Sequence, residues 1–191
     1  MKNLKVPQIN QPPLPLQAQS ASQETCSYLI PDLLCSGLDL VLCGTALGAA
    51  SAKAKAYYAH PQNKFWPTLH KIGLIPEPLQ AADYARLNDY GIGLTDLCKI
   101  ASGNDDELPR EAIDRDGLRA KIELYQPRFL AFTSLTGARW FLKKPKATYG
   151  LQPERIGKTQ IYALHSTSPR ASGAWSDSSW HELAKLISDK S

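Results

Sequence analysis

The sequence predicts an α/β fold, a three-layer sandwich in which helices flank a central, mostly parallel four-stranded sheet. Three short apolar runs have the length and composition of strands buried on both faces: residues 38–43 (LDLVLC), 128–133 (RFLAFT) and 160–164 (QIYAL). Segments with helical periodicity separate these runs, and strands that alternate with helices are joined by parallel crossovers. In such sheets ligands bind beyond the carboxyl ends of the strands, so we expect a site at the residues that begin with Gly44, Thr95 and His165.

Helices are expected between and after these strands. The periodicity of apolar residues predicts helical segments at 65–72, 81–87, 118–125, 136–143 and 180–187. Pro127 ends the third of them, and Ser178 or Ser179 is expected to cap the last. The first strand is expected to end at Gly44, where the chain turns.

The composition is that of one globular domain preceded by a tail. Of the 191 residues, 43% are hydrophobic and 21% charged, which is enough for a sizeable core. Residues 1–24 are rich in Pro, Gln and Ser and cannot bury enough apolar surface to offset their ordering entropy, so we predict a disordered tail followed by a single domain over 25–191. The net charge of +4 permits a polyanionic partner without requiring one.

Several classes of protein are disfavoured. The four cysteines are scattered, no CxxC pair occurs and only four histidines are present, so we expect neither a structural zinc site nor another metal or cofactor. No apolar run approaches the ~20 residues of a membrane span, and the N-terminus lacks the pattern of a signal peptide. We therefore expect an intracellular, cytoplasmic protein.

The segment after the first strand combines a glycine turn with groups that can bind a nucleobase. In residues 44–48 (GTALG), glycine at both ends lets the backbone approach a ligand, although a plain strand-to-helix turn explains the pattern equally well. In residues 57–66 (YYAHPQNKFW), Tyr58 offers a stacking surface and Asn63 an amide that both donates and accepts hydrogen bonds. Phe65 and Trp66 fit the apolar face of the following helix and are expected in the core.

These motifs carry a resemblance to a known family. The stretch GTALGAASAKAKAYYAHPQNKFW resembles the first motif of the uracil-DNA glycosylase superfamily, particularly its mismatch-specific uracil/thymine branch, and YYAHPQNKFWP is also similar to the hypoxanthine branch. Residues 91–97 (GIGLTDL) match the middle segment of the family, and 164–170 (LHSTSPR) stand where it has its minor-groove loop. The resemblance covers about 38–186. It implies base excision repair: a monofunctional enzyme flips uracil or hypoxanthine, or another mismatched base, out of DNA and hydrolyses its N-glycosidic bond.

One position departs from the family. The asparagine that orients water in the mismatch-specific branch falls at Ala46, which has no polar side-chain atom. In the hypoxanthine branch the asparagine of the His-Pro-x-Asn box is implicated instead, and Asn63 stands there. Asp96 is the other candidate, because a carboxylate can deprotonate water, although a helix cap or turn residue is an equal interpretation. A catalytically weakened or inactive protein that binds DNA lesions is the alternative function.

The resemblance also assigns further roles. Tyr58 stacks on the extruded base, Asn63 and the backbone of Thr45, Ala46, Leu47 and Gly48 contact its edge, and His165 polarises the base or stabilises its anion. The hydroxyls of Ser166, Thr167 and Ser168 grip phosphates beside the flipped nucleotide, and Arg170 fills the vacated stack. No lysine stands where a Schiff-base nucleophile is needed, so hydrolysis without strand cleavage is predicted.

The remaining expectations concern partners and a third interpretation. The protein is expected to be a monomer, associated with the nucleoid and without contact to membranes. Surface lysines at 53, 55, 143, 144 and 146 are expected to be solvated or to contact DNA non-specifically. An unrelated doubly wound enzyme that binds a nucleotide at 44–48 is disfavoured, because the sequence has neither a Gly-x-Gly-x-x-Gly nor a Gly-Lys-Ser/Thr signature.

Overall fold

The computed structural model describes residues 28–189 and contains a five-stranded sheet in the order β2-β1-β3-β5-β4. The strands are β1 (Leu40–Leu47), β2 (Ile92–Ser102), β3 (Phe129–Phe132), β4 (Gly150–Ile156) and β5 (Thr159–Ala163). All neighbouring pairs are parallel except β4 and β5, which are antiparallel. The α/β sandwich with a mostly parallel sheet is thus confirmed, with five strands rather than four. The tail predicted for residues 1–24 lies outside the described residues.

The additional strand, β4, lies at the edge of the sheet, which explains why its sequence gives a weak signal. Most of its residues are exposed or half-buried, and Pro153 lies within it. A proline lacks the amide hydrogen that a central strand needs, but an edge strand tolerates it. The apolar run that identifies a buried strand is therefore missing here.

Strand β1 runs further than expected, and β2 continues past Thr95, where site residues beyond a strand end were expected. β1 continues past Gly44 to Leu47, because residues 44–46 pair with β2: Gly44 stands opposite Asp96 and Ala46 opposite Cys98. The register shifts between Ala46 and Leu47, where the strand leaves the sheet. The prediction that the chain turns at Gly44 is therefore wrong. Asp96 is a strand residue and not a helix cap or turn residue.

The predicted helices are present with small shifts of their ends. They are α2 (Phe65–Lys71), the 3-10 helix η2 (Ala81–Tyr90), α3 (Arg115–Tyr125), α4 (Leu135–Leu142) and α5 (Ser178–Ser188). The structure adds three short elements: α1 (Ala49–Ala54), η3 (Arg110–Ala112) and η4 (Pro169–Ala174).

The cap expected for α5 was wrong. The capping residue is Asp177, and its carboxylate pairs with Lys71 instead of bonding the helix. Ser179 is buried within the first turn, and its hydroxyl is directed to His165.

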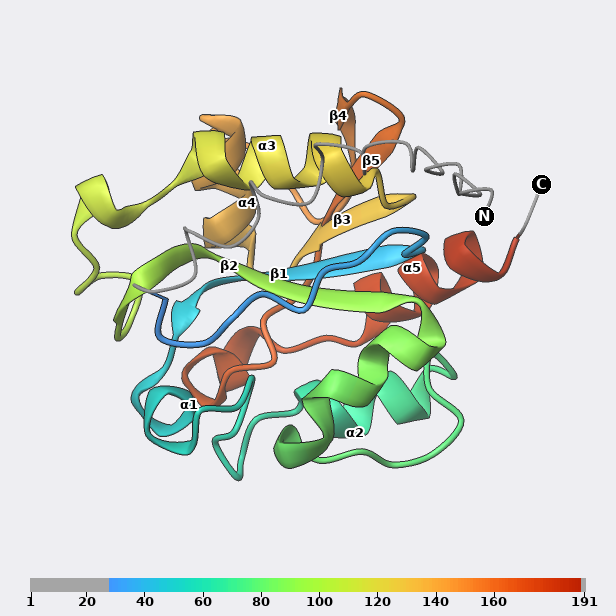
Figure 1. The fold of residues 1–191 in the computed structure, drawn as a ribbon, viewed down its shortest axis with the longest axis horizontal. Helices are drawn as coiled ribbons and strands as arrows, with labels where there is room; N and C mark the ends of the chain where they lie inside the picture. The colour runs from blue at the N-terminus through green and yellow to red at the C-terminus, as the bar shows by residue number, and fades with distance from the viewer. Residues whose placement is uncertain (1–27, 190–191) are drawn as a thin grey trace, which may run out of the picture.

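Helices cover both faces of the sheet (Figure 1): α3 and α4 lie on one side, and α2 and α5 on the other. Alternate residues of β1 enter the two cores, because successive side chains of a strand point to opposite faces. Leu40 and Leu42 pack with Phe65, Trp66 and residues of α5, whereas Val41 and Cys43 pack with residues of α3 and α4. The core assignment of Phe65 and Trp66 is confirmed. Within residues 28–189, no helix has both the length and the apolar character needed to cross a membrane.

Candidate active site

A cavity of about 580 Å³ lies where β1 passes into α1 and β3 into α4. The loops that follow β2 and β5 and the segment between α1 and α2 also form its wall. All the site residues predicted from the sequence except His165 line this cavity: Thr45, Ala46, Leu47, Gly48, Tyr58, Asn63, Asp96, Ser166, Thr167, Ser168 and Arg170. The structure thus brings together three motifs that are far apart in the chain.

Asp96 lies directly against the backbone of Gly44. A Cβ atom added at Gly44 would be 2.2 Å from Asp96 Oδ1 and 3.4 Å from the Tyr58 hydroxyl. Because no real Cβ tolerates the first of these distances, any other residue at position 44 would force the Asp96 carboxylate to move. The close approach of this carboxylate is thus a reason for the glycine besides the ligand approach that the sequence suggested.

The Asp96 carboxylate is buried and only weakly paired. Its side chain is 3% exposed, and within residues 28–189 its Oδ2 atom has no hydrogen-bond partner; Lys99 Nζ is 3.8 Å away. Burial raises the pKa of Asp96 to about 6, although the positive charge of Lys99 opposes the rise. A carboxylate with a pKa near neutrality, at the wall of a cavity, suits a general base.

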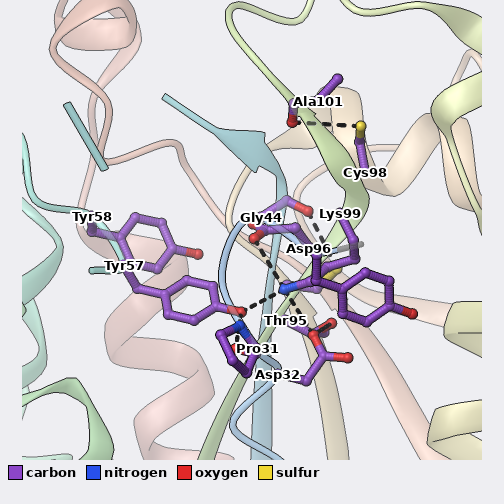
Figure 2. Close-up of polar contacts among 12 residues, drawn as sticks. Pro31, Asp32, Gly44, Tyr57, Tyr58, Thr95, Asp96, Cys98, Lys99 and Ala101 are labelled. Carbon is purple, nitrogen blue, oxygen red and sulfur yellow. Dashed lines mark hydrogen bonds and ion pairs between the residues drawn. The ribbon is translucent and has the colours of Figure 1, made fainter. Parts of the chain in front are cut away.

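Lys99 links Asp96 to a second carboxylate, that of the half-buried Asp32 (Figure 2). Its Nζ is 2.9 Å from Asp32 Oδ1 and 2.8 Å from the Tyr57 hydroxyl, and the lysine is 5% exposed. Asp32 also accepts a hydrogen bond from the Thr95 hydroxyl and pairs with Lys121 at 2.8 Å. Although burial disfavours ionisation of Asp32, Lys99 and Lys121 outweigh it and lower its pKa.

The charge of Lys99 is consequently neutralised mainly by Asp32. Asp96 is left with the longer contact to Lys99, at 3.8 Å, and its ionisation remains costly. This group of residues was not predicted from the sequence. The one available signal was a lysine inside the otherwise apolar strand around residues 97–101.

Tyr58 is fixed in the wall of the cavity. Its ring stacks on Phe65 with 3.7 Å between centroids, and its hydroxyl lies 3.1 Å from Thr133 Oγ1. The backbone φ of Tyr58 is +54°, a left-handed conformation that a tyrosine adopts at some energetic cost. Burial raises the pKa of Tyr58 well above its usual range, so the phenol stays neutral. Phe65 thereby supports a rigid aromatic surface beside Asp96.

Asn63 is partly engaged by the backbone at the start of α2. Its Oδ1 accepts a hydrogen bond from the Phe65 amide at 3.0 Å. Its side-chain NH₂ group has no partner among the described residues. Asn63 therefore offers the cavity a donor, which can bind a carbonyl oxygen but cannot take a proton from water.

His165 does not reach the cavity wall. Its ring stacks on Tyr149 with 3.7 Å between centroids, and its Nδ1 is 2.8 Å from Ser179 Oγ. Burial lowers the pKa of His165, which favours the neutral imidazole. Tyr149, on which the His165 ring stacks, lines the cavity, whereas His165 itself does not.

The predicted phosphate-binding hydroxyls differ in accessibility. Thr167 is 2% exposed, and its carbonyl accepts a hydrogen bond from the Lys64 amide, which ties this loop to the start of α2. Ser166 and Ser168 are half-buried and Arg170 is exposed. The burial of Thr167 was not expected for a phosphate contact, and it makes Thr167 an anchor of the loop.

The cavity contains a second acidic group that the sequence analysis missed. Asp105 lies on its wall, and its carboxylate interacts with the hydroxyls of Thr45 and Thr136. Burial raises the pKa of Asp105. Thr45 is also hydrogen bonded to Ser134 at 3.1 Å, so these side chains hold the ends of β1 and β3 together. In the part of the chain that the structure describes, no group of three or more His, Cys, Asp or Glu side chains could hold a metal ion.

Comparisons with known proteins agree with the geometry. Residues 31–186 match the family model described as the uracil DNA glycosylase superfamily. The structure also matches the solution NMR structure of a "putative Uracil DNA glycosylase" from Methanosarcina acetivorans, with a TM-score of 0.61 and 19% sequence identity. The match covers 83% of this chain and 96% of that chain, and at this identity it establishes a shared fold.

Proposed function

Because this chain belongs to the uracil DNA glycosylase superfamily, we propose that it is a monofunctional DNA glycosylase acting on deaminated or mismatched bases. The observation that supports catalysis is the Asp96 carboxylate, which is buried against Gly44 at the cavity wall. Uracil is the proposed substrate and hypoxanthine a further one. We propose that the protein acts as a monomer on nucleoid DNA in the cytoplasm.

In the proposed reaction, Asp96 activates the attacking water. As the bond between C1′ and the base nitrogen breaks, its electron pair leaves with the base, and positive charge develops on the sugar. Water then adds to C1′, and ionised Asp96 accepts the proton that this water loses. The same negative charge stabilises the cationic sugar. The released base anion regains a proton from solvent.

The remaining roles concern the extruded nucleotide. Tyr58 would stack on the base, with Phe65 supporting the other face of its ring. The NH₂ group of Asn63 would donate to a carbonyl oxygen of uracil or hypoxanthine. Flipping costs a few kcal/mol and is easiest at a mismatch or lesion, which favours such substrates. Ser166, Ser168 and Arg170 would contact the strand beside the flipped nucleotide.

Hydrolysis without strand cleavage is part of the proposal. Strand cleavage by a glycosylase requires an amine nucleophile, and among the described residues no lysine lines the cavity. Lys99 is near Asp96 but is held by Asp32 and Tyr57.

The test is a single-turnover assay of base release from duplexes that contain uracil, hypoxanthine, xanthine or mismatched thymine. We expect free uracil or hypoxanthine and an intact strand with an abasic site. Asp96→Asn should lower the rate about 10²–10⁴-fold, the usual contribution of a general base. Asn63→Ala should weaken substrate binding more than it lowers the rate.

A second function is favoured by one observation. Ala46 lines the cavity where the family asparagine would act, so the protein could have kept lesion binding without catalysis. Tight, lesion-selective binding with no free base at saturating protein would establish this function and refute the glycosylase proposal.

A further inference from the structure

A second cavity, of about 590 Å³, lies beside α4, outside the candidate active site. Four cationic side chains line it, and no acidic residue does: Arg110, Arg115, Arg139 and Lys143. Within residues 28–189, none of the four forms a salt bridge. Its volume is within the ~300–1,000 Å³ of typical ligand sites. Arg110 interacts electrostatically with Asp105 at longer range, but the cavity itself gathers four cations and no carboxylate, which indicates a ligand that carries negative charge.

The cavity also contains an aromatic surface beside its cations. The guanidinium of Arg110 lies over the Trp140 ring, 4.1 Å from its centroid, and Arg110 is itself exposed. Arginine planes and aromatic rings are both surfaces on which nucleobases stack. The cavity therefore offers a flat surface for a base and separate cations for a phosphate.

The two cavities are neighbours. Thr136, at the start of α4, lines both of them. Ala46 of the first cavity and Trp140 of the second pack against the same small apolar cluster, which contains Cys98 and Leu108. A strand bound at the candidate active site is therefore close to the second cavity.

We propose that this second cavity binds one further nucleotide of the DNA strand that enters the candidate active site. The phosphate would contact Arg115 and Lys143, and the base would lie against Arg110 and Trp140. This inference rests on the proposed function because it takes DNA as the ligand. It does not require that the protein catalyses base release. A free nucleotide would offer the same base and phosphate. Because Thr136 lines both cavities, we favour a nucleotide of the bound DNA strand as the ligand.

The experiment measures the affinity of a fluorescein-labelled DNA strand by anisotropy across a salt series. Lys143→Gln and Arg115→Gln should each weaken binding several-fold and reduce the slope of log K against log [salt] by about 0.7–0.9, the effect of one lost phosphate contact. Lys146→Gln is the matched control. It removes the same charge three residues from Lys143, at an exposed side chain that does not line the cavity.

A substitution that changes no charge separates the contribution of base stacking from that of the phosphate contacts. Trp140→Leu should weaken binding without changing the salt slope, because it removes a stacking surface and no charge. The thermal unfolding of this variant shows whether the packing of α4 is preserved. If the packing is lost, the result for Lys143→Gln alone decides whether the cavity binds DNA. Equal affinities and slopes for Lys143→Gln and Lys146→Gln would overturn the proposal.

Two further measurements assign the ligand. The indole NMR signal of Trp140 should shift on addition of the DNA strand. A shift with free dAMP and none with the strand would refute a strand subsite. Base release by the unaltered protein is measured in parallel. If it is absent while Lys143→Gln still selectively weakens DNA binding, the glycosylase proposal fails and the subsite stands.

Discussion

Gly44 and Asp96 face each other across β1 and β2, so close that a Cβ atom on Gly44 would lie 2.2 Å from Asp96 Oδ1. The substitution Gly44→Ala must therefore move the carboxylate. A displacement of about 1 Å at a reacting group lowers rates on the order of 10²-fold, and we expect this loss in single-turnover base release. DNA affinity should change much less.

Gly173→Ala is the control for this substitution, because a Cβ atom there meets nothing within 4 Å. Its rate should match that of the unaltered protein. A Gly44→Ala variant that retains the full rate would show that the position of Asp96 is unimportant.

Removing the charge of Asp96 should stabilise the protein while it abolishes activity. The pKa of Asp96 is about 6 in the folded protein, against 3.8 for an unperturbed aspartate. Well below pH 3.8 the group is protonated in both states and costs nothing. As the pH rises from 3.8 to about 6 the unfolded state ionises while the folded state stays protonated, so the folded state loses stability; above 6 both states are ionised and the loss levels off.

Asp96→Asn escapes this loss. Its advantage over the unaltered protein in urea unfolding should grow between about pH 4 and pH 6, to about 1–3 kcal/mol, and stay level above that. A constant or shrinking difference over this range would mean that the folded protein does not disfavour the Asp96 charge. Active sites commonly show this opposition between stability and function.

The pH dependence of base release should report on Asp96 and Lys99 together. If ionised Asp96 is the base, the single-turnover rate rises with pH and levels off above about 6. Lys99→Met removes the cation that favours ionisation, so the midpoint should move to higher pH. Lys121→Met, on the far side of Asp32, should move it less.

Lys99 acts through Asp96 in this scheme, so it is a positioning residue. A purely structural role would lower the amount of folded protein without moving the midpoint. An unchanged midpoint in Lys99→Met would therefore argue against electrostatic control of Asp96.

The parts of the fold that the sequence predicted were those marked by local patterns. Apolar runs identified β1, β3 and β5, and apolar periodicity identified the helices, because burial on one or two faces leaves a mark along the chain. The ends of β1 and β2 were missed. Their last residues are held by pairing with each other, as Gly44 is with Asp96 and Ala46 with Cys98, and the sequence of one strand does not reveal its partner.

The site showed the same division. The candidate site residues were predicted chiefly from the resemblance of three motifs to the family, and the structure brings all of these candidates except His165 to one cavity. Asp32 and Lys99 were not predicted, because a buried ion pair between distant segments has no local pattern. Asp105 was missed for a similar reason: it is a loop residue, and its partners Thr45 and Thr136 are distant in the sequence.

The stacking role of Tyr58 can be separated from its hydrogen bond. Tyr58→Phe keeps the ring on Phe65 and removes only the contact with Thr133, whereas Tyr58→Ala removes the ring. Loss of base stacking costs about 1–3 kcal/mol, so Tyr58→Ala should weaken binding of uracil-containing DNA about 5- to 150-fold relative to Tyr58→Phe. The affinities are measured by anisotropy with Asp96→Asn as the common background, so that substrate persists. Undamaged DNA should show little difference between the two variants, because no base is extruded. Equal affinities for uracil-containing DNA would exclude Tyr58 as the stacking surface, and the base would then have to lie elsewhere in the cavity.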